Sequence, residues 1–235
     1  MGQMIKMTAS KIRSAALKLG ADLCGIAPVD RFSSAPKGFH PNDIYGRCQS
    51  VLVFAKRLPA ESLFASSCIP YTYMNRIITE EVDRLTLTLS RELESLGVKN
   101  VAVPSDDPSE YWERDRSYAR GILSLRHAGH LAGLGVLGKN TLLINDRLGN
   151  MIQLGALLLS LKLEGDPIAG YSACKQDCQL CIRSCPQSAL DGTTVNQQAC
   201  RQLSNYRNER GFLLKKCWEC RRVCPSYSGI ANTKE

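Results

Sequence analysis

Apolar residues recur at helical spacing in two stretches of the first hundred residues. Residues 10–19, SKIRSAALKL, carry one such stripe and end at Gly20. Residues 77–96 carry the clearer stripe, which ends at Gly97 and consists of Ile78, Val82, Leu85, Leu89, Leu93 and Leu96. Steps of three or four residues place apolar side chains on one face of a helix, and glycine is a common helix stop. The pattern predicts two amphipathic helices.

Short continuous apolar runs separate these helices and predict buried strands. The runs are ADLCGIAPV (residues 21–29), SVLVFA (50–55) and VKNVAVP (98–104). The order helix, strand, strand, long helix, strand indicates a layered α/β arrangement. The segment PSDDPSE, residues 104–110, has the composition of a loop.

A glycine-rich loop, GLGVLGKNT, lies farther along the chain at residues 133–141. Residues 118–132 before it predict a helix. The runs NTLLI (140–144) and MIQLGALLLSL (151–161), joined by the turn NDRLGN, predict strands. The loop is therefore expected between a helix and a hairpin.

The letters of this loop match two nucleotide-binding motifs. Gly133, Gly135 and Gly138 spell the dinucleotide fingerprint, and with Lys139 they spell the start of a phosphate loop. The fingerprint needs a strand before it and a helix after it, and the phosphate loop needs Ser or Thr where Asn140 stands. The remaining interpretations are a tight loop that a ligand or neighbouring backbone approaches closely, and a simple packing turn.

The composition shifts near residue 165, where cysteine, glutamine and arginine become frequent and the periodic stripes end. This shift predicts one domain over residues 1–165 and a second over residues 166–235. The chain has 235 residues, a formal charge of +8 and no apolar run of the ~20 residues that a membrane span needs. Its first twenty residues lack the features of a secretory signal, so we expect a cytoplasmic protein without membrane contact.

Eight of the eleven cysteines lie between Cys174 and Cys224. In a reducing compartment such crowding indicates metal ligands. Two runs follow the spacing C-x2-C-x3-C-P, which is typical of proteins with two [4Fe-4S] clusters, and in such proteins the cysteine before the proline binds the other cluster. The spacing thus predicts one cluster on Cys174, Cys178, Cys181 and Cys224, and a second on Cys185, Cys200, Cys217 and Cys220.

Two zinc sites are the alternative, because zinc also uses C-x2-C pairs. Two clusters with four thiolates each would carry about −2 apiece and bring the charge to about +4. The surplus of lysine and arginine then serves mostly to offset cluster charge and solvate the surface, with nucleic-acid binding as the other interpretation. A pair of clusters only carries electrons, so the preceding domain should hold an acceptor or a substrate.

Several segments resemble the epoxyqueuosine reductase family, which is related to the reductive dehalogenases. They are LKLGADLCGIAPVDRF, AGLGVLGKNTLLI, LGNMIQLGALLLSLKLEGD and the two cysteine runs, and the resemblance spans nearly the whole chain. It implies an α+β protein with a nitroreductase-like α/β domain that holds cobalamin, followed by a ferredoxin-like domain with two [4Fe-4S] clusters. It also places the glycine loop in the cobalamin-binding region, which makes Gly133, Gly135, Gly138, Lys139, Asn140 and Thr141 candidate cofactor-binding residues.

The chain departs from the family in two places. Family enzymes carry an acidic proton donor in an Asp-Ser/Thr-x-Pro motif, and the matching position here is Ala119. They also extend into a helical region that contacts tRNA, whereas this chain ends ten residues after Pro225. A short form without either feature is expected. His127, in SLRHAGHLAGLG, is a candidate proton donor or corrinoid contact.

The leading hypothesis is an iron–sulfur oxidoreductase that passes electrons from two clusters to cobalamin and reduces a small-molecule substrate. One alternative is an electron-transfer or activating protein that reduces the cofactor of a partner redox protein. The other is an epoxyqueuosine reductase that acts on tRNA, for which the basic charge is the independent support. We expect an external electron donor such as a ferredoxin or a flavodoxin.

Overall fold

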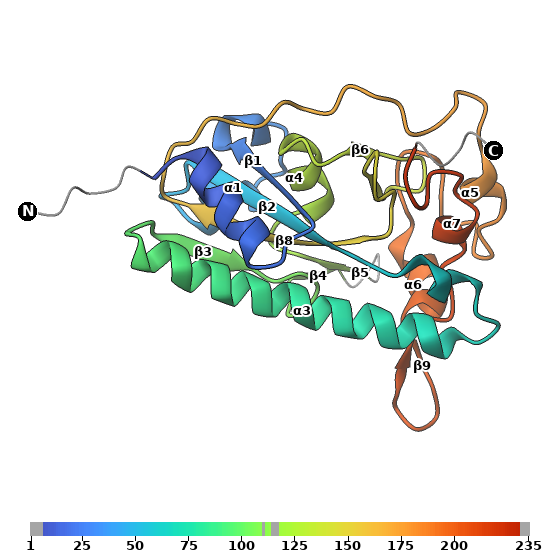
Figure 1. Ribbon diagram of the computed structural model, residues 1–235. Coiled ribbons are helices and arrows are strands. Elements are labelled where there is room, and N and C mark those ends of the chain that lie inside the picture. Colours follow the sequence, from blue (N-terminus) through green and yellow to red (C-terminus); the bar gives the residue numbers. More distant parts are fainter. Residues whose placement is uncertain (1–6, 110, 114–117, 231–235) are drawn as a thin grey trace, which may run out of the picture.

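The computed structural model describes residues 7–109, 111–113 and 118–230 of the chain. A four-stranded sheet forms its centre, in the order β1-β2-β8-β3 (Figure 1). The strands are β1 (Leu23–Pro28), β2 (Ser50–Arg57), β8 (Ile152–Leu159) and β3 (Asn100–Val103). All three pairings are antiparallel. The three apolar runs predicted as strands are therefore confirmed, and MIQLGALLLSL supplies the fourth strand beside β2.

Helices cover both faces of this sheet, and successive side chains of β2 point to opposite faces. Leu52 and Phe54 pack in one core with α1 (Ala9–Lys18) and the long α3 (Cys68–Ser95). Val51 and Val53 pack in the other with α4 (Leu125–Leu131). Because both faces are buried, β2 is apolar at every position from Val51 to Ala55 rather than alternating with polar residues.

The α3 helix begins nine residues before the predicted start at residue 77. The Ser67 hydroxyl accepts a hydrogen bond from the Ile69 N–H at 3.2 Å and caps the helix. Pro70 sits in the first turn, where its missing N–H breaks no helical hydrogen bond. The apolar stripe detects only the part of α3 that lies on the sheet, so it missed this first segment.

The helix predicted over residues 118–132 was wrong in its first half. Its first residues form β5 (Tyr118–Arg120), which pairs with β4 (Tyr111–Glu113), and the helix starts only at Leu125. Pairing with a partner strand overrides the local preference of this segment. The predicted hairpin of residues 140–144 and 151–161 was also wrong. The strand β7 (Leu143–Ile144) pairs with β6 (Val136–Leu137), which lies inside the glycine-rich loop, and β8 pairs with β2 and β3.

The cysteine-rich segment lies at one end of the molecule, opposite the end where the chain begins (Figure 1). It contains three short helices and one hairpin: α5 (Leu180–Arg183), α6 (Gln197–Ser204), α7 (Glu219–Arg222), and β9 (Tyr206–Arg207) with β10 (Leu213–Leu214). The amino-terminal part adds α2 (Pro41–Ile44) and the 3-10 helices η1 (Val29–Phe32) and η2 (Ala60–Phe64). Among the described residues, no helix combines the length and apolarity needed to cross a membrane.

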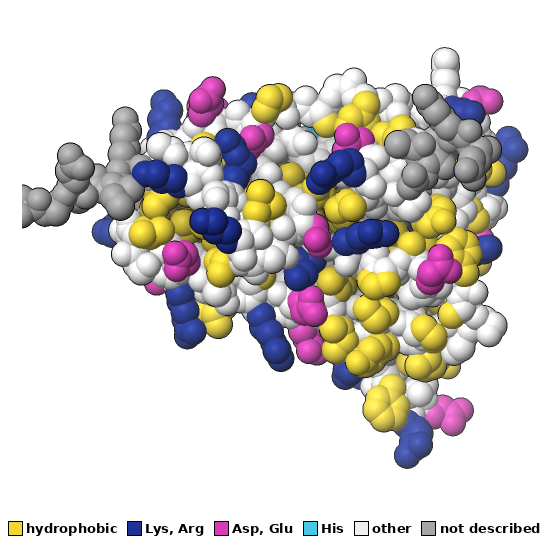
Figure 2. Space-filling view, viewed as in Figure 1, with side chains coloured by type: hydrophobic (Ala, Val, Ile, Leu, Met, Phe, Trp, Pro, Cys, Tyr) yellow, Lys and Arg dark blue, Asp and Glu magenta, His cyan; other side chains and the backbone are white. Residues whose placement is uncertain are grey.

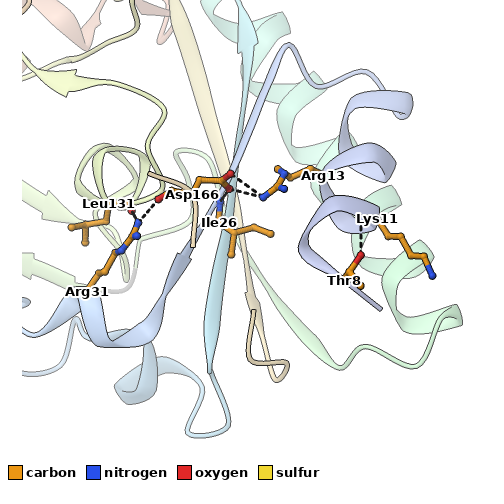
Figure 3. Close-up of polar contacts among 7 residues, drawn as sticks. All are labelled: Thr8, Lys11, Arg13, Ile26, Arg31, Leu131 and Asp166. Atoms are coloured by element: carbon orange, nitrogen blue, oxygen red, sulfur yellow. Dashed lines mark hydrogen bonds and ion pairs between the residues drawn. The ribbon is translucent and has the colours of Figure 1, made fainter. Parts of the chain in front are cut away.

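An extended segment connects β8 to the cysteine-rich end and is fixed to the sheet by Asp166 (Figure 3). The Asp166 carboxylate accepts hydrogen bonds from the Arg13 guanidinium at 2.9 and 3.0 Å and from the Ile26 N–H at 2.8 Å. The Arg31 guanidinium donates to the Leu131 carbonyl at 2.6 Å and to the Asp166 carbonyl at 2.7 Å. These contacts tie the start of the connecting segment to α1, β1 and α4.

Candidate metal and cofactor site

The two C-x2-C-x3-C runs adopt the same local backbone conformation. Gln179 precedes α5 with φ −132° and ψ 17°, and Trp218 precedes α7 with φ −138° and ψ 18°. Each four-residue helix carries the middle cysteine of its run, and the two helices pack against each other. The sequence repeat is thus a structural repeat, which brings the two runs face to face.

Four of the cysteines are close neighbours around Cys181 and Cys224. Burial raises the pKa of the Cys224 thiol to about 11, and charge on Cys174, Cys178 and Cys181 acts in the same direction. Burial also raises the pKa of Cys181, again with contributions from Cys174 and Cys178. Cys224 is therefore close enough to the cysteines of the other run for their charges to act on its thiol.

The other four cysteines are neighbours in the same way. Burial raises the pKa of Cys220 to about 12, and charge on Cys200 and Cys217 adds to it. Burial raises the pKa of Cys217 as well, with contributions from Cys200 and Cys185. Cys220 also interacts with Cys181, which belongs to the first group. We call the group around Cys224 the first set and the group around Cys217 the second set; they lie next to each other.

Each set offers four thiols as potential metal ligands. Thiolates are the donors that both iron–sulfur clusters and structural zinc take, so the residues present fit a metal centre of either kind. Among the described residues, no three His, Cys, Asp or Glu side chains converge closely enough to hold one metal ion. Backbone N–H groups point at two of the sulfurs: Lys139 lies 3.5 Å from Cys174 Sγ, and Ala189 lies 3.3 Å from Cys185 Sγ.

A cavity of about 380 Å³ lies between the sheet domain and the cysteine-rich segment. All four cysteines of the second set line it, and within the described part of the chain no cysteine of the first set does. Its opposite wall comes from α3, α4, the glycine loop and the start of β8. The second set is thus the one that faces the cavity.

Three buried amide atoms in this cavity, two of Asn150 and one of Gln197, lack hydrogen-bond partners within the described structure. Asn150 is 1% exposed, and neither its Nδ2 nor its Oδ1 atom is bonded within the described structure. The same holds for Oε1 of Gln197 on α6. Buried polar groups without partners are rare in folded proteins, and here they accompany a cavity that a ligand can fill. They are the observation that makes the cavity fit a polar cofactor or substrate.

The glycine loop contacts the cysteine-rich segment directly. Lys139 Nζ donates to the backbone carbonyls of Gln176 at 2.7 Å and Cys178 at 2.9 Å, with a longer contact of 3.3 Å to that of Lys175. The Asn140 amide is 3% exposed and donates to the Cys220 carbonyl at 3.1 Å. Lys139 therefore holds the ligand loop of the first set, and Asn140 holds a ligand of the second.

The three glycines of the loop lie where other backbone or side chains approach closely. A Cβ at Gly133 would overlap the Pro167 carbonyl, and one at Gly135 would overlap the Ile144 carbonyl. A Cβ at Gly138 would lie 2.5 Å from the Ile144 side chain. Of the loop residues predicted to bind a cofactor, Asn140 and Thr141 line the cavity. The glycines shape the turn against its neighbours.

His127 lies beside this region, on α4. One ring nitrogen, Nδ1, is 2.7 Å from the Ser124 hydroxyl. Burial lowers the pKa of the imidazole, and the positive charge of Arg126 and His130 acts in the same direction. His127 does not belong to the cavity lining found within the described residues. Asp115, the acidic residue near the family motif, lies outside the described residues.

Several cavity residues escaped the sequence analysis. Asn150, Arg126, Arg201 and Arg221 belong to no motif. The sequence gives only weak indications of their role. Asn150 ends the NDRLGN turn before a buried strand, and Arg201 and Arg221 directly follow a predicted ligand cysteine. Their convergence depends on tertiary packing between residues far apart in the chain.

Comparisons with known proteins place this arrangement in a family, although no family model matches the chain. The epoxyqueuosine reductase of Staphylococcus aureus is 30% identical over 207 residues, which are 83% of this chain and 48% of the relative. The chain thus spans about half the length of that relative.

Solved structures of two kinds of enzyme share the fold. An epoxyqueuosine reductase with a modified tRNA stem loop superposes with a TM-score of 0.67 over 93% of this chain and 64% of that one, at 18% identity. A catabolic reductive dehalogenase with 3-bromo-4-hydroxybenzoic acid superposes with a TM-score of 0.71 over 99% and 34%, at 15% identity. The chain belongs to the epoxyqueuosine reductase-like family, and it shares its fold with a reductive dehalogenase.

Proposed function

We propose that this chain is an iron–sulfur oxidoreductase with two [4Fe-4S] clusters that pass single electrons to cobalamin and reduce a small-molecule substrate. The observation that carries the proposal is the crossed grouping of the cysteines, with the second set alone lining the cavity. The interaction of Cys220 with Cys181 supports electron exchange between the sets. Zinc sites alone would not explain why one cysteine set faces a cavity with unpartnered amides.

When bound, the clusters would supply one-electron steps and the cobalamin a metal centre that accepts them. The residues of this chain position these groups. Lys139 and Asn140 fix the cysteine loops to the sheet domain, and the buried amide of Asn150 offers a donor and an acceptor to a bound ligand. The cavity walls are built from both parts of the chain.

Proton delivery in this site would differ from the family pattern, since Ala119 stands at the matching position. We propose His127 as a donor, on the ground that it lies on α4 beside the cavity residues Leu125 and Arg126. Because its pKa is lowered, the protonated form that donates would be more populated at acidic pH, and turnover through His127 should rise as the pH falls. If His127 delivers the proton, the pH profile of turnover should lose one ionisation in His127→Gln.

Electrons would come from an external donor such as a ferredoxin or a flavodoxin. A groove of about 560 Å³, lined by Cys217, Trp218 and Phe64, opens beside the second set. Near it, Figure 2 shows hydrophobic side chains gathered over the start of α3 and the β9–β10 hairpin. Ile69, Tyr73, Phe212 and Leu213 are exposed there. This surface is a candidate for partner docking.

The test is reconstitution of the chain with iron, sulfide and cobalamin without oxygen. The proposal expects about eight irons per chain, cluster absorption in the visible spectrum, and a corrinoid that co-elutes with the protein. Intact clusters without any retained corrinoid would contradict it and favour the electron-transfer alternative, in which a partner's cofactor is reduced. Two bound zinc ions would contradict both.

Epoxyqueuosine in tRNA is a second candidate substrate, because curated relatives of the chain are named epoxyqueuosine reductases. The formal charge of +8 also suits a phosphate backbone. Binding of tRNA should then weaken steeply with salt, since each neutralised phosphate contributes to the slope. A weak response that stays flat between low and moderate salt would exclude this substrate.

A further inference from the structure

The cavity that the second set lines is unusually rich in positive charge. Arg126, Arg201, Lys215 and Arg221 all line it, against the acidic side chains Asp106 and Glu219. Glu219 is already paired with Arg222 at 2.6 Å. Asp106 is therefore the one acidic side chain of this lining, within the described residues, that is left to balance four cations.

These cations come from both parts of the chain and are close enough to affect one another. Burial lowers the pKa of Arg126, and the charges of Arg201 and Arg221 lower it further. Burial lowers the pKa of Lys215, and Arg201 and Arg221 act in the same direction, whereas the carboxylates of Asp106 and Asp107 oppose them. Guanidinium groups stay charged at neutral pH, so their crowding in a partly buried place costs free energy unless an anion joins them.

These cations differ in how many of their donors are already bonded. Arg126 donates to the Thr141 hydroxyl at 2.7 Å, Lys215 donates to Asn205 Oδ1 at 2.8 Å, and Arg221 donates to the Asn150 carbonyl. Within the described structure, the Arg201 guanidinium has no hydrogen-bond acceptor or ion-pair partner. The unpartnered amide of Asn150 and Oε1 of Gln197 line the same cavity.

The unpartnered donors of Arg201 suit an anion that offers two acceptor atoms. Carboxylates and phosphodiesters are such groups, and both match the planar fork of a guanidinium.

We propose that this cavity binds a small molecule through a carboxylate or phosphodiester group, with Arg201 and Arg126 as the anion ligands and Asn150 as the amide contact. The inference deepens the proposed function, on which it rests for the role of the cavity. The anion has two chemical sources: the substrate itself, or the phosphodiester in the nucleotide arm of cobalamin.

The experiment is calorimetry on the cluster-loaded full chain, with benzoate and dimethyl phosphate as anions and benzamide as the neutral control. Wild-type protein should bind an anion and not benzamide. Arg201→Gln and Arg126→Gln should each weaken anion binding about tenfold or more, because each loses a charged hydrogen bond. Arg91→Gln, at an exposed position on α3, is the matched control and should bind like wild type.

Corrinoids separate the two sources. If cobalamin displaces dimethyl phosphate and cobinamide, which lacks the phosphodiester, does not, the site holds the cofactor's phosphate. If benzoate still binds to the cobalamin-loaded protein, the site holds an anionic substrate. Either result supports the proposal. It is overturned if wild type binds neither anion, or if both arginine variants bind anions as Arg91→Gln does. Iron content and corrinoid retention, measured on the same samples, report separately on the proposed function.

Discussion

The two cysteine sets each contain four thiols and each draw on both C-x2-C-x3-C runs, but they face different surroundings. The second set lines the cavity, and Asn140 contacts it from the glycine loop. The first set is held by Lys139, whose ammonium group binds carbonyls of the loop from Lys175 to Cys178. The comparison teaches that two sets with the same number of thiols differ in what the sheet domain places beside each of them.

The largest expected effect is on delivery of electrons to the cavity. Cys185→Ala removes a ligand of the second set, and Cys174→Ala removes one of the first. With dithionite as reductant, we expect Cys185→Ala to reduce bound cobalamin no faster than protein without clusters. Cys174→Ala should keep a measurable rate, because its second set still faces the cavity. Stopped-flow absorbance of the corrinoid measures the reduction rate of each variant. Equal rates in the two variants would contradict the claim that only the second set faces the cavity.

The junction between the sheet domain and the end of the cysteine segment gives the next largest effect. Gly149 has φ +61°, and a Cβ there would overlap the Tyr227 carbonyl. Gly97 has φ +81° with open space around a Cβ. Gly97→Ala should cost about 1–2 kcal/mol of stability for its backbone conformation alone. Gly149→Ala should cost about 2 kcal/mol more for the overlap.

Thermal unfolding of both glycine variants measures the difference. Cluster content should also fall in Gly149→Ala, since Tyr227 lies three residues after Cys224. Similar melting temperatures for the two variants would show that the close approach at Gly149 contributes nothing.

Lys139→Met should affect the two sets unequally. It removes the hydrogen bonds to the first ligand loop and keeps the backbone N–H near Cys174 Sγ. Charged hydrogen bonds contribute about 1.5–3 kcal/mol each when intact, less at a half-exposed site such as this. We expect the first cluster to be lost to a chelator several-fold faster, with the second unchanged. Lys99→Met, at an exposed position, is the control; equal loss of both clusters would contradict the assignment of Lys139.

Asp166→Asn should give the smallest effect and should not distinguish the sets. The carboxylate pairs with Arg13 at a partly exposed site and also accepts from Ile26 N–H. We expect a loss of about 1–2 kcal/mol in the free energy of unfolding and normal content of both clusters. Chemical denaturation of the cluster-free variant measures it. Selective loss of one cluster would show instead that the Asp166 contacts also stabilise the binding site of that cluster.

The sequence predicted the elements whose burial leaves a periodic or continuous apolar pattern. The stripe from Ile78 to Leu96 predicted most of α3, and the run SVLVFA predicted β2. The β4–β5 hairpin was missed, because a helical pattern over residues 118–132 outweighed a pairing that only the folded chain reveals. The start of α3 was missed because it lies beyond the sheet and carries no stripe.

The two cysteine runs stand out in the sequence because their spacing is a local property of the chain, and their role as metal ligands stays a prediction. The contacts of Lys139 could not be predicted, since the lysine lies about forty residues before the carbonyls it binds. The same holds for the cationic cavity, where Arg126 meets Arg201 and Arg221 only through packing of the two parts. In the sequence, Lys139 is marked only by the glycine-rich loop, and the three arginines are marked by no motif. Their contacts are visible only in the folded structure.

The crossed arrangement is the central claim, and one comparison of single-ligand variants tests it most directly. Cys224→Ala, Cys178→Ala and Cys217→Ala would each be reconstituted, reduced and measured by low-temperature electron paramagnetic resonance with iron counting. The account predicts that the signal remaining in Cys224→Ala matches that in Cys178→Ala and differs from that in Cys217→Ala, because Cys224 belongs to the first set. A match between Cys224→Ala and Cys217→Ala instead would show that each run binds its own cluster, and would contradict the account.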